Sequence, residues 1–459
     1  MKEESKEIIT NGKEALKAAA GIPIEAVKTT VEVEKEGLKM VEKAIVYPIK
    51  KRRSIQDFFW KSKRGVITGC ADNDPAGIVT YTQTGAIAGY RLLWLALLAW
   101  PLLVAIEEMS ARIGVVTKKG INQVITEHYG RFWAYLAALI VLICNTFTIG
   151  ADIAAMADIS AIVTKLPSII FVILFGGLFF YLLWKKGYKI VSRYLFILTP
   201  IFFLYIASAL LLDVPWGLAL RSTFIPELGS INLSLATIAV AFLGTTLSPY
   251  LIYWETTQEI EEKKEVSQLK IENRGTILGM FFTQFITFFI VVAAAAAFGG
   301  NFHEISSAKE AALALKPLGN LSFLFFSLGI LGSGLLGIPV LAATTGYAAS
   351  ETFGWRRGLD EKVSSAHGFY IVMISSLLVG ILIALLGFNP VLMLVYSQVL
   401  NGILMPILII LLLLISNNRK IMATHTNRLF TNFFGILAFF VCLGFDILMI
   451  YNWLKNYIS

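Results

Sequence analysis

The chain has 459 residues, of which 56% are hydrophobic and only 15% are charged. This composition excludes an ordinary soluble domain and indicates a protein that crosses a membrane several times. The formal net charge of +8 is better explained by membrane topology than by an affinity for nucleic acid. We therefore expect an all-α polytopic membrane protein.

Residues 1–64 are predicted to form a separate cytoplasmic region that is basic and amphipathic. Lys and Glu alternate there with small and aliphatic residues, and a break is expected near Pro23. The basic run 50–53, followed by the aromatic residues 58–60, is typical of an anchor on anionic lipid. A solvated tail that obeys the positive-inside rule explains the same residues equally well. The sequence leaves both interpretations open.

Eleven apolar segments of roughly membrane-spanning length follow. They cover residues 66–88, 91–116, 131–163, 168–184, 193–213, 231–253, 275–298, 320–349, 368–388, 391–416 and 430–453. Lys and Arg are concentrated in every second loop, which places the N-terminus in the cytoplasm and the C-terminus outside. We expect the protein in the plasma membrane of a bacterium.

The first and the sixth of these spans are interrupted by proline and polar residues. The first break covers residues 69–77 around Pro75, and the second covers residues 244–250 around Pro249. Proline removes a helix hydrogen bond, and freed backbone groups are tolerated in hydrocarbon only where they line a cavity or meet a ligand. Matching breaks in two halves of a chain therefore indicate the substrate site of a transporter.

The two breaks divide ten of the spans into two sets of five. The sets correspond to residues 65–213 and 231–416, and the span 430–453 is additional. An odd number of spans in each set forces the two sets into opposite membrane orientations. This pattern predicts the five-plus-five inverted-repeat transporter fold of the LeuT type with an eleventh helix.

Carboxylates lie at membrane depth in the first and third spans. Asp72 and Asp74 belong to the first break, and Asp152 lies well inside the third span. Such residues are functional candidates by default. An Asp before Pro is also a common helix N-cap, which gives Asp74 a structural explanation as well. The amide of Gln398 fits either a contact with an ion through water or a hydrogen bond between helices.

Several motifs together resemble the Nramp-type divalent metal transporters. The first motif consists of residues 74–78, 84–86 and 89–94, in and directly after the first span. The others are residues 111–117 in the second span, 151–154 in the third and 397–399 in the tenth. The resemblance extends from residue 65 to about residue 450. It implies the inverted-repeat fold and a divalent cation as the substrate. It implies nothing about residues 1–64.

The chain departs from that family's pattern at the expected metal ligands. The family's first-span motif Asp-Pro-Gly-Asn reads Asp-Pro-Ala-Gly at residues 74–77, so the amide ligand is missing. Around the sixth-span proline, the family's methionine and histidine are replaced by Ser248 and Tyr250. The magnesium-transporting branch related to the family also lacks the methionine, and the chain resembles a divergent member close to that branch.

These replacements favour a site made of oxygen ligands. A thioether selects soft or borderline ions, whereas Mg²⁺ prefers oxygen and Mn²⁺ accepts it. We therefore expect transport of Mg²⁺ or Mn²⁺. The candidate metal ligands come from the two breaks and the tenth span, and they are Asp74, Asp72, Ala71, Gly77, Thr245, Thr246, Ser248 and Gln398.

Proton coupling is predicted to be weak or absent. Asp152 and Tyr250 are the candidates for a proton path or vestibule, but Tyr is poorly suited to proton exchange near neutral pH. Ala155 stands where the family has a second acid on the third span, and span 368–388 contains no arginine. The resemblance alone implies a proton symporter, so residues and resemblance disagree on this point.

Three other functions remain open from the sequence. One is a proton-coupled Mn²⁺ or Fe²⁺ symporter, the second is a carrier of an organic substrate on the same fold, and the third is a non-transporting membrane sensor. A cluster of acids would repel the carboxylate of an amino-acid substrate. We expect neither an enzyme nor a bound cofactor, because no nucleophile–base constellation is present. The partners expected are the metal ion and the lipid bilayer.

Overall fold

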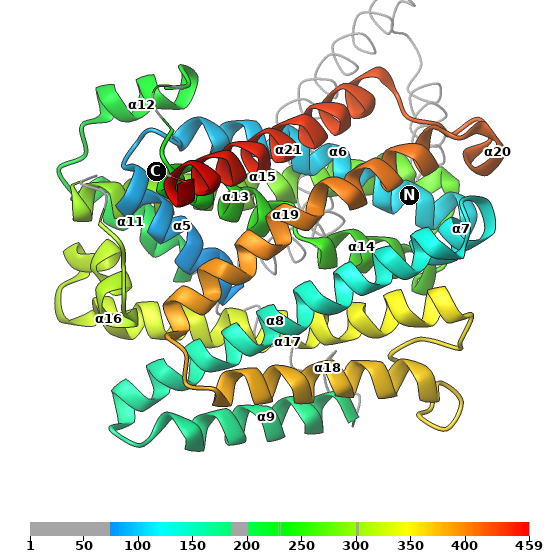
Figure 1. Cartoon of the computed structure of the whole chain (residues 1–459), viewed down its shortest axis with the longest axis horizontal. Coiled ribbons are helices and arrows are strands. Elements are labelled where there is room, and N and C mark those ends of the chain that lie inside the picture. Colours follow the sequence, from blue (N-terminus) through cyan, green and yellow to red (C-terminus); the bar gives the residue numbers. More distant parts are fainter. Residues whose placement is uncertain (1–73, 185–200, 228, 230, 300–302, 459) are drawn as a thin grey trace, which may run out of the picture. The chain divides into compact units, whose positions relative to one another are not determined.

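The computed structural model describes residues 74–184, 201–227, 229, 231–299 and 303–458 (Figure 1). The predicted region 1–64 and two proposed ligands, Ala71 and Asp72, lie outside these described residues. All regular secondary structure in the described part of the chain is helical. The expected all-α class is confirmed.

The helices follow the predicted spans closely. Their bounds are α5 Pro75–Ala88, α6 Leu93–Thr117, α7 Ile121–His128, α8 Arg131–Thr164, α9 Ser168–Trp184, α11 Phe203–Leu211, α12 Trp216–Phe224, α13 Leu233–Thr246, α14 Pro249–Glu261, α15 Leu269–Phe298, α16 Ala308–Ala311, α17 Ser322–Phe353, α18 His367–Leu385, α19 Pro390–Asn417, α20 Arg419–Met422 and α21 Leu429–Ile458. Two 3₁₀ helices, Val266–Gln268 and Ala312–Leu321, precede α15 and α17.

Eight stretches of helix among the described residues are long and apolar enough to cross a membrane, and α9 is slightly shorter. The predicted spans 66–88 and 193–213 lie partly outside the described residues. The sixth span is longer than predicted, because α14 continues to Glu261. The short helices α7, α12, α16 and α20 were not predicted, since none has the length of a membrane span.

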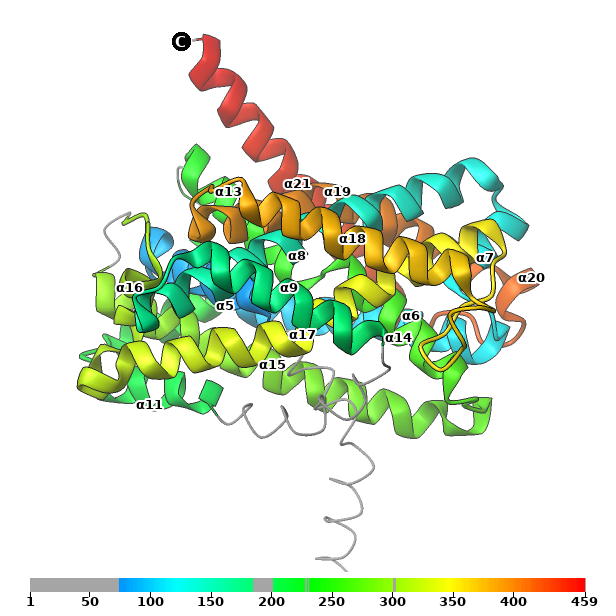
Figure 2. The ribbon, with the colours of Figure 1, turned by 90° about the horizontal axis from the view of Figure 1, so that it is seen from below.

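The two interrupted helices lie in the interior of the bundle. Thirteen of the 14 residues of α5 are buried, and α13 is buried along most of its length. The pair is surrounded by α8, α15, α17 and α19. Helices α8, α9, α17 and α18 lie side by side in Figures 1 and 2. Helix α5 carries several polar side chains, including Thr80, Thr82 and Gln83, which are costly to expose to lipid, and this favours its position among other helices.

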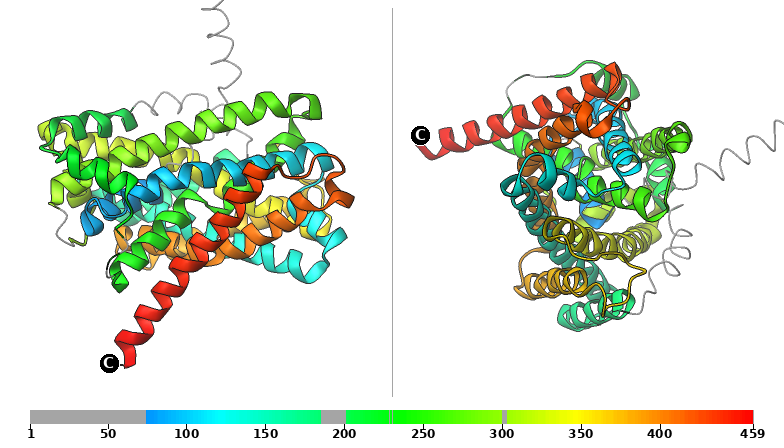
Figure 3. Two further views of the ribbon diagram at one scale, coloured as in Figure 1. Left: turned by 90° about the horizontal axis from the view of Figure 1, so that it is seen from above. Right: turned by 90° about the vertical axis from the view of Figure 1, so that its right-hand side faces the viewer.

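The C-terminal part of α21 diverges from its neighbours, as Figures 2 and 3 show. Its exposed side chains there are large and apolar, and they include Ile447, Tyr451 and Trp453. A surface of this kind is covered by lipid in a membrane protein. The C-terminal part of this helix is therefore peripheral.

Close packing of α13 and α19 depends on two glycines. A Cβ atom at Gly244 would lie 2.0 Å from the carbonyl oxygen of Gln398, and one at Gly402 would lie 2.4 Å from the carbonyl oxygen of Val240. Both neighbours are backbone atoms, so they have little freedom to move away. Small residues that allow close helix approach are typical of membrane interfaces.

Gly402→Ala is expected to destabilise the bundle. Overpacking typically costs about 1–3 kcal/mol, so the apparent melting temperature in detergent should fall by several degrees. Gly444→Ala on α21 is the matched control, because nothing lies within 4 Å of the Cβ it would add. Thermal unfolding followed by size-exclusion chromatography provides the measurement. Equal melting temperatures for the two variants would contradict this account of the α13–α19 contact.

Candidate metal site

Asp74 stands at the start of α5, where the first break ends. Its side chain is 2% exposed, and its Oδ1 accepts a hydrogen bond of 2.6 Å from the N–H of Gly77. Pro75 occupies the first helical position, where a missing N–H has no cost. The expected capping role of Asp74 is therefore present. A carboxylate has about four lone-pair positions, so one capping bond leaves capacity for a cation.

Asp152 of α8 lies next to this helix start. Its side chain is completely buried, it interacts electrostatically with Asp74, and it faces the backbone N–H of Ala76. Neither carboxylate oxygen has a hydrogen bond of normal geometry from the described residues. If both carboxyl groups were ionised in this medium of low dielectric constant, they would repel each other strongly. A divalent cation between them would remove that repulsion.

Two glycines bring α17 close to the same point. A Cβ atom at Gly337 would lie 3.3 Å from the Cβ of Asp74, and one at Gly334 would meet the side chains of Met156 and Pro75. Helix α17 thus forms a wall of the candidate site with very little side-chain bulk. Any larger residue there would compete with the carboxylate for space.

The second break consists of Leu247 and Ser248, between α13 and α14. The Ser248 hydroxyl donates hydrogen bonds to the carbonyl oxygens of Gly244 at 3.0 Å and Thr245 at 2.8 Å. It satisfies the last carbonyls of α13 and does not cap α14. The C-terminal end of a helix carries partial negative charge, which favours a cation. The break therefore places buried oxygen atoms of the kind that hard divalent ions prefer, some of them already bonded to Ser248.

A direct contact joins the two interrupted helices. The Tyr81 hydroxyl of α5 lies 3.0 Å from the Thr246 hydroxyl of α13, and the latter also donates to the carbonyl of Phe242 at 2.8 Å. The Tyr81 ring packs edge-on against Phe242 with a centroid distance of 5.1 Å. Thr246 is therefore occupied in fixing α5 against α13.

The remaining predicted residues have different surroundings. The Thr245 hydroxyl is buried and has no hydrogen-bond partner among the described residues. Gln398 donates to the Ser397 hydroxyl and accepts from Asn401 at 2.8 Å, so its side chain is held within α19. Gly77 contributes its N–H to Asp74. Tyr250 is buried in the first turn of α14.

Carboxylates alone do not complete a ligand set. Among the described residues, no group of three or more His, Cys, Asp or Glu side chains is placed to hold a metal. Asp74 and Asp152 would therefore need hydroxyl, carbonyl or water oxygens as further ligands. These oxygen donors suit a hard cation, whereas the buried thioether of Met156, beside Pro75 and Gly334, is a soft donor next to the same point.

Sequence reasoning missed a buried polar network around Asn122 of α7. The backbone N–H of Asn122 donates to Glu351 at 3.1 Å, and its side chain accepts from the Tyr253 hydroxyl at 2.6 Å. Glu351 also pairs with Arg357 at 3.6 Å. This network joins α7, α14 and α17. The one available signal was the glutamate just after the predicted span 320–349, since its partners are far apart in sequence.

Asn145 of α8 was missed as well. Its side-chain amide donates to the carbonyl of Leu341 at 3.1 Å and lies within hydrogen-bonding distance of the Thr344 and Thr345 hydroxyls. These bonds join α8 to α17 in the membrane interior. They fix the helix that carries Asp152 against the helix that contacts Asp74. A single Asn in an apolar span gives no indication of its partner.

Known proteins resemble this chain over most of its length. The family described as natural resistance-associated macrophage protein-like matches residues 65–452. A divalent metal cation transporter MntH of Caldanaerobacter subterraneus subsp. tengcongensis is 26% identical over 411 residues, which cover 85% of this chain and 92% of the relative. The MntH of Deinococcus radiodurans is 28% identical over 400 residues, covering 81% and 85%.

Solved structures confirm the predicted fold class. The Eremococcus coleocola manganese transporter, in complex with an aromatic bis-isothiourea compound, superposes with a TM-score of 0.69 at 15% identity and covers 86% of this chain and 87% of its own. MhsT in complex with L-phenylalanine gives a TM-score of 0.54 at 14% identity, covering 84% and 98%. At these identities the likeness concerns the fold alone.

The curated relatives are named as transporters, which agrees with the expectation that the chain is not an enzyme. The apolar helices show that it is an integral membrane protein. The family match covers far more than half of the sequence and includes both broken helices. This chain therefore belongs to the Nramp family.

Proposed function

We propose that the chain transports divalent metal cations across the membrane, with Mg²⁺ or Mn²⁺ as the favoured ion. The observation that carries this proposal is the pair of buried carboxylates, Asp74 and Asp152, at the start of the interrupted helix α5. Relatives named divalent metal cation transporters support the substrate class. The ion is the cargo, and no bound cofactor is part of the proposal.

The favoured ion follows from the ligands that the chain offers. Asp74 supplies a carboxylate, Thr245 supplies a buried hydroxyl, and the second break supplies carbonyl oxygens beside Ser248. Mg²⁺ usually keeps several waters and needs only one or two carboxylates, and Mn²⁺ also accepts oxygen ligands. Asp72, Ala71 and Gln398 remain proposed contributors, the first two from outside the described residues.

The membrane arrangement is part of the same proposal. Residues 65–213 and 231–416 are assigned as the two inverted repeats, and residues 430–453 as the additional span. The N-terminus, with region 1–64, is assigned to the cytoplasm of a bacterium and the C-terminus to the outside. The distribution of Lys and Arg supports this orientation.

An organic substrate fits this interior less well. Two buried carboxylates would repel an amino-acid carboxylate, and they favour a cation without any further change. A non-transporting sensor would have no need for a buried carboxylate pair, which is costly in a membrane. A proton-coupled symporter differs from the proposal only in coupling, and a flux measurement separates the two.

Asp74→Asn is expected to weaken divalent metal binding by about tenfold or more, because a neutral amide lacks the charge that attracts the ion. Asn caps helices about as well as Asp, and the amide removes the repulsion with Asp152, so the melting temperature without metal should not fall. Binding and flux are measured on purified and reconstituted protein. Asp74→Ala serves as the comparison that also loses the cap. Wild-type flux by Asp74→Asn would show that the proposed site is wrong.

Ser248→Met is expected to shift selectivity towards Cd²⁺, since a thioether is a soft ligand. The variant also loses the bonds from the Ser248 hydroxyl to the carbonyls of Gly244 and Thr245. Ser248→Ala loses the same bonds without adding sulfur, so it isolates the effect of the ligand. Competition between Cd²⁺ and Mn²⁺ in proteoliposomes is the measurement. A strong Cd²⁺ preference in the wild type, unchanged by Ser248→Met, would argue against an oxygen site.

Metal uptake is expected to occur with little or no proton cotransport, driven by the membrane potential. Tyr250 stands at the position where the family has an exchangeable His. Ala155 stands where the family has a second acid on the third span, and span 368–388 contains no arginine to continue a proton route. The test is the lumenal pH of proteoliposomes during uptake at a valinomycin-clamped potential. Strong metal-dependent acidification that disappears in Asp152→Asn would show instead that the protein is a proton symporter.

A further inference from the structure

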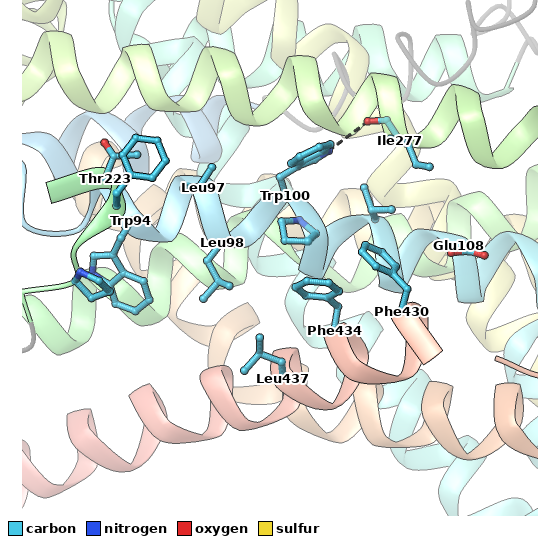
Figure 4. A pocket seen from close by; sticks show the side chains of 14 residues that line it. Trp94, Leu97, Leu98, Trp100, Glu108, Thr223, Ile277, Phe430, Phe434 and Leu437 are labelled. Atoms are coloured by element: carbon cyan, nitrogen blue, oxygen red, sulfur yellow. Dashed lines mark hydrogen bonds between the residues drawn. The ribbon is translucent and has the colours of Figure 1, made fainter. Parts of the chain in front are cut away.

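A long apolar groove follows one side of α6, as Figure 4 shows. Its volume is about 810 Å³, and its walls come from α6, α12, α15 and α21. Trp94 lies at one end and Glu108 at the other, and Leu97, Phe434 and Leu437 lie between them. Glu108 follows Trp94 by 14 positions, which correspond to about 21 Å of helix at 1.5 Å per residue. This length exceeds the roughly 15 Å of hydrocarbon in one leaflet of a bilayer.

The walls of the groove are both connected and exposed. The Trp100 indole donates a hydrogen bond of 3.3 Å to the carbonyl of Ile277, which ties α6 to α15 across the groove (Figure 4). Leu97 is 44% exposed and Phe430 is 50% exposed, so the groove opens towards the hydrocarbon of the membrane. Acyl chains are the apolar molecules available at that surface.

A polar pocket of about 600 Å³ adjoins the Glu108 end of the groove. The groove and the pocket share Glu108, Ile277 and Phe430, so they form one continuous depression. The polar side chains of the pocket come from α6, from the segment before α15 and from the loop before α21. They include Arg112, Ser267, Thr424, His425, Thr426 and Arg428.

The charge in this pocket is positive. Glu108 is its one acidic side chain, and its two oxygens already accept from Arg112 at 2.8 Å and Thr431 at 3.0 Å. Arg428 makes no ion pair among the described residues and lies close enough to Arg112 for mutual repulsion. An anion placed between the two guanidinium groups would relieve that repulsion, and Arg binds phosphate particularly well.

We propose that this depression binds one anionic phospholipid, with an acyl chain in the apolar groove and its phosphate at Arg428 and Arg112. The pocket lies at the end of α6 that the distribution of basic residues assigns to the cytoplasm. Anionic lipids are enriched in that leaflet, and basic pockets between transmembrane helices bind their headgroups. The hydroxyls of Ser267, Thr424 and Thr426 suit a glycerol headgroup. Among the described residues that line the pocket, no second acid is present for the ammonium group of a zwitterionic lipid.

Native mass spectrometry of the full-length protein in detergent tests this proposal. Phosphatidylglycerol, phosphatidylethanolamine and phosphatidylcholine with identical acyl chains are added separately. We expect one phosphatidylglycerol to bind several-fold more tightly than either zwitterionic lipid. Arg428→Gln should weaken that binding by about fivefold, as expected for one basic residue near a membrane surface. Arg428→Lys should restore most of it.

Matched controls separate this site from general lipid affinity. Arg419→Gln removes an exposed charge that lines neither depression, and it should leave binding unchanged. Leu97→Trp fills the groove and should weaken binding, whereas Leu139→Trp, at another exposed position, should not. Equal binding of the three lipids, or equal losses in Arg428→Gln and Arg419→Gln, would overturn the proposal. If glycerol phosphate displaced phosphatidylglycerol at equal concentration, the pocket would be a site for a free phosphate. That result would also overturn the proposal.

Discussion

At the two helix breaks, backbone N–H and C=O groups lose their helix hydrogen bonds inside the membrane, and their need for other partners shapes the rest of the structure. Hydrocarbon offers them no hydrogen bonds, so each interrupted helix must satisfy its ends with side chains or with a ligand. The Asp74 carboxylate does this at the start of α5, and the Ser248 hydroxyl does it at the end of α13. Both side chains place oxygen atoms in the buried interior of the bundle. A cation-binding interior follows from the same bonds that make the helix breaks tolerable.

The surrounding helices hold these breaks in place through small residues and buried amides. Gly244 and Gly402 allow α13 to lie against α19, and Gly337 allows α17 to reach Asp74. Asn145 then joins α8 to α17 with hydrogen bonds that are expensive to break in a dry environment. Stability and function therefore share one set of contacts. Larger side chains at these helix crossings would displace the carboxylates and would also loosen the packing of the bundle.

Hydropathy and proline positions predicted most of the fold, because a membrane span needs about 20 apolar residues and leaves a long, clear signal. The short helix α7 and the Asn122–Glu351 contact left no such signal, since their formation depends on tertiary packing. At the site, the sequence indicated both carboxylates but not their proximity. It also did not indicate that the Gln398 side chain hydrogen-bonds to neighbouring side chains of the same helix, α19. Which groups this side chain meets depends on how α19 is rotated about its axis, and the sequence does not give that rotation.

In the proposed function, a divalent ion binds at Asp74, next to Asp152 of α8. Anomalous diffraction from crystals of the full-length protein soaked in Mn²⁺ tests it most directly, because the signal locates the metal without assuming its ligands. We predict one strong peak within coordination distance of an Asp74 carboxylate oxygen and near the break between α13 and α14. A strong peak elsewhere in the bundle, with none at Asp74, would contradict the account.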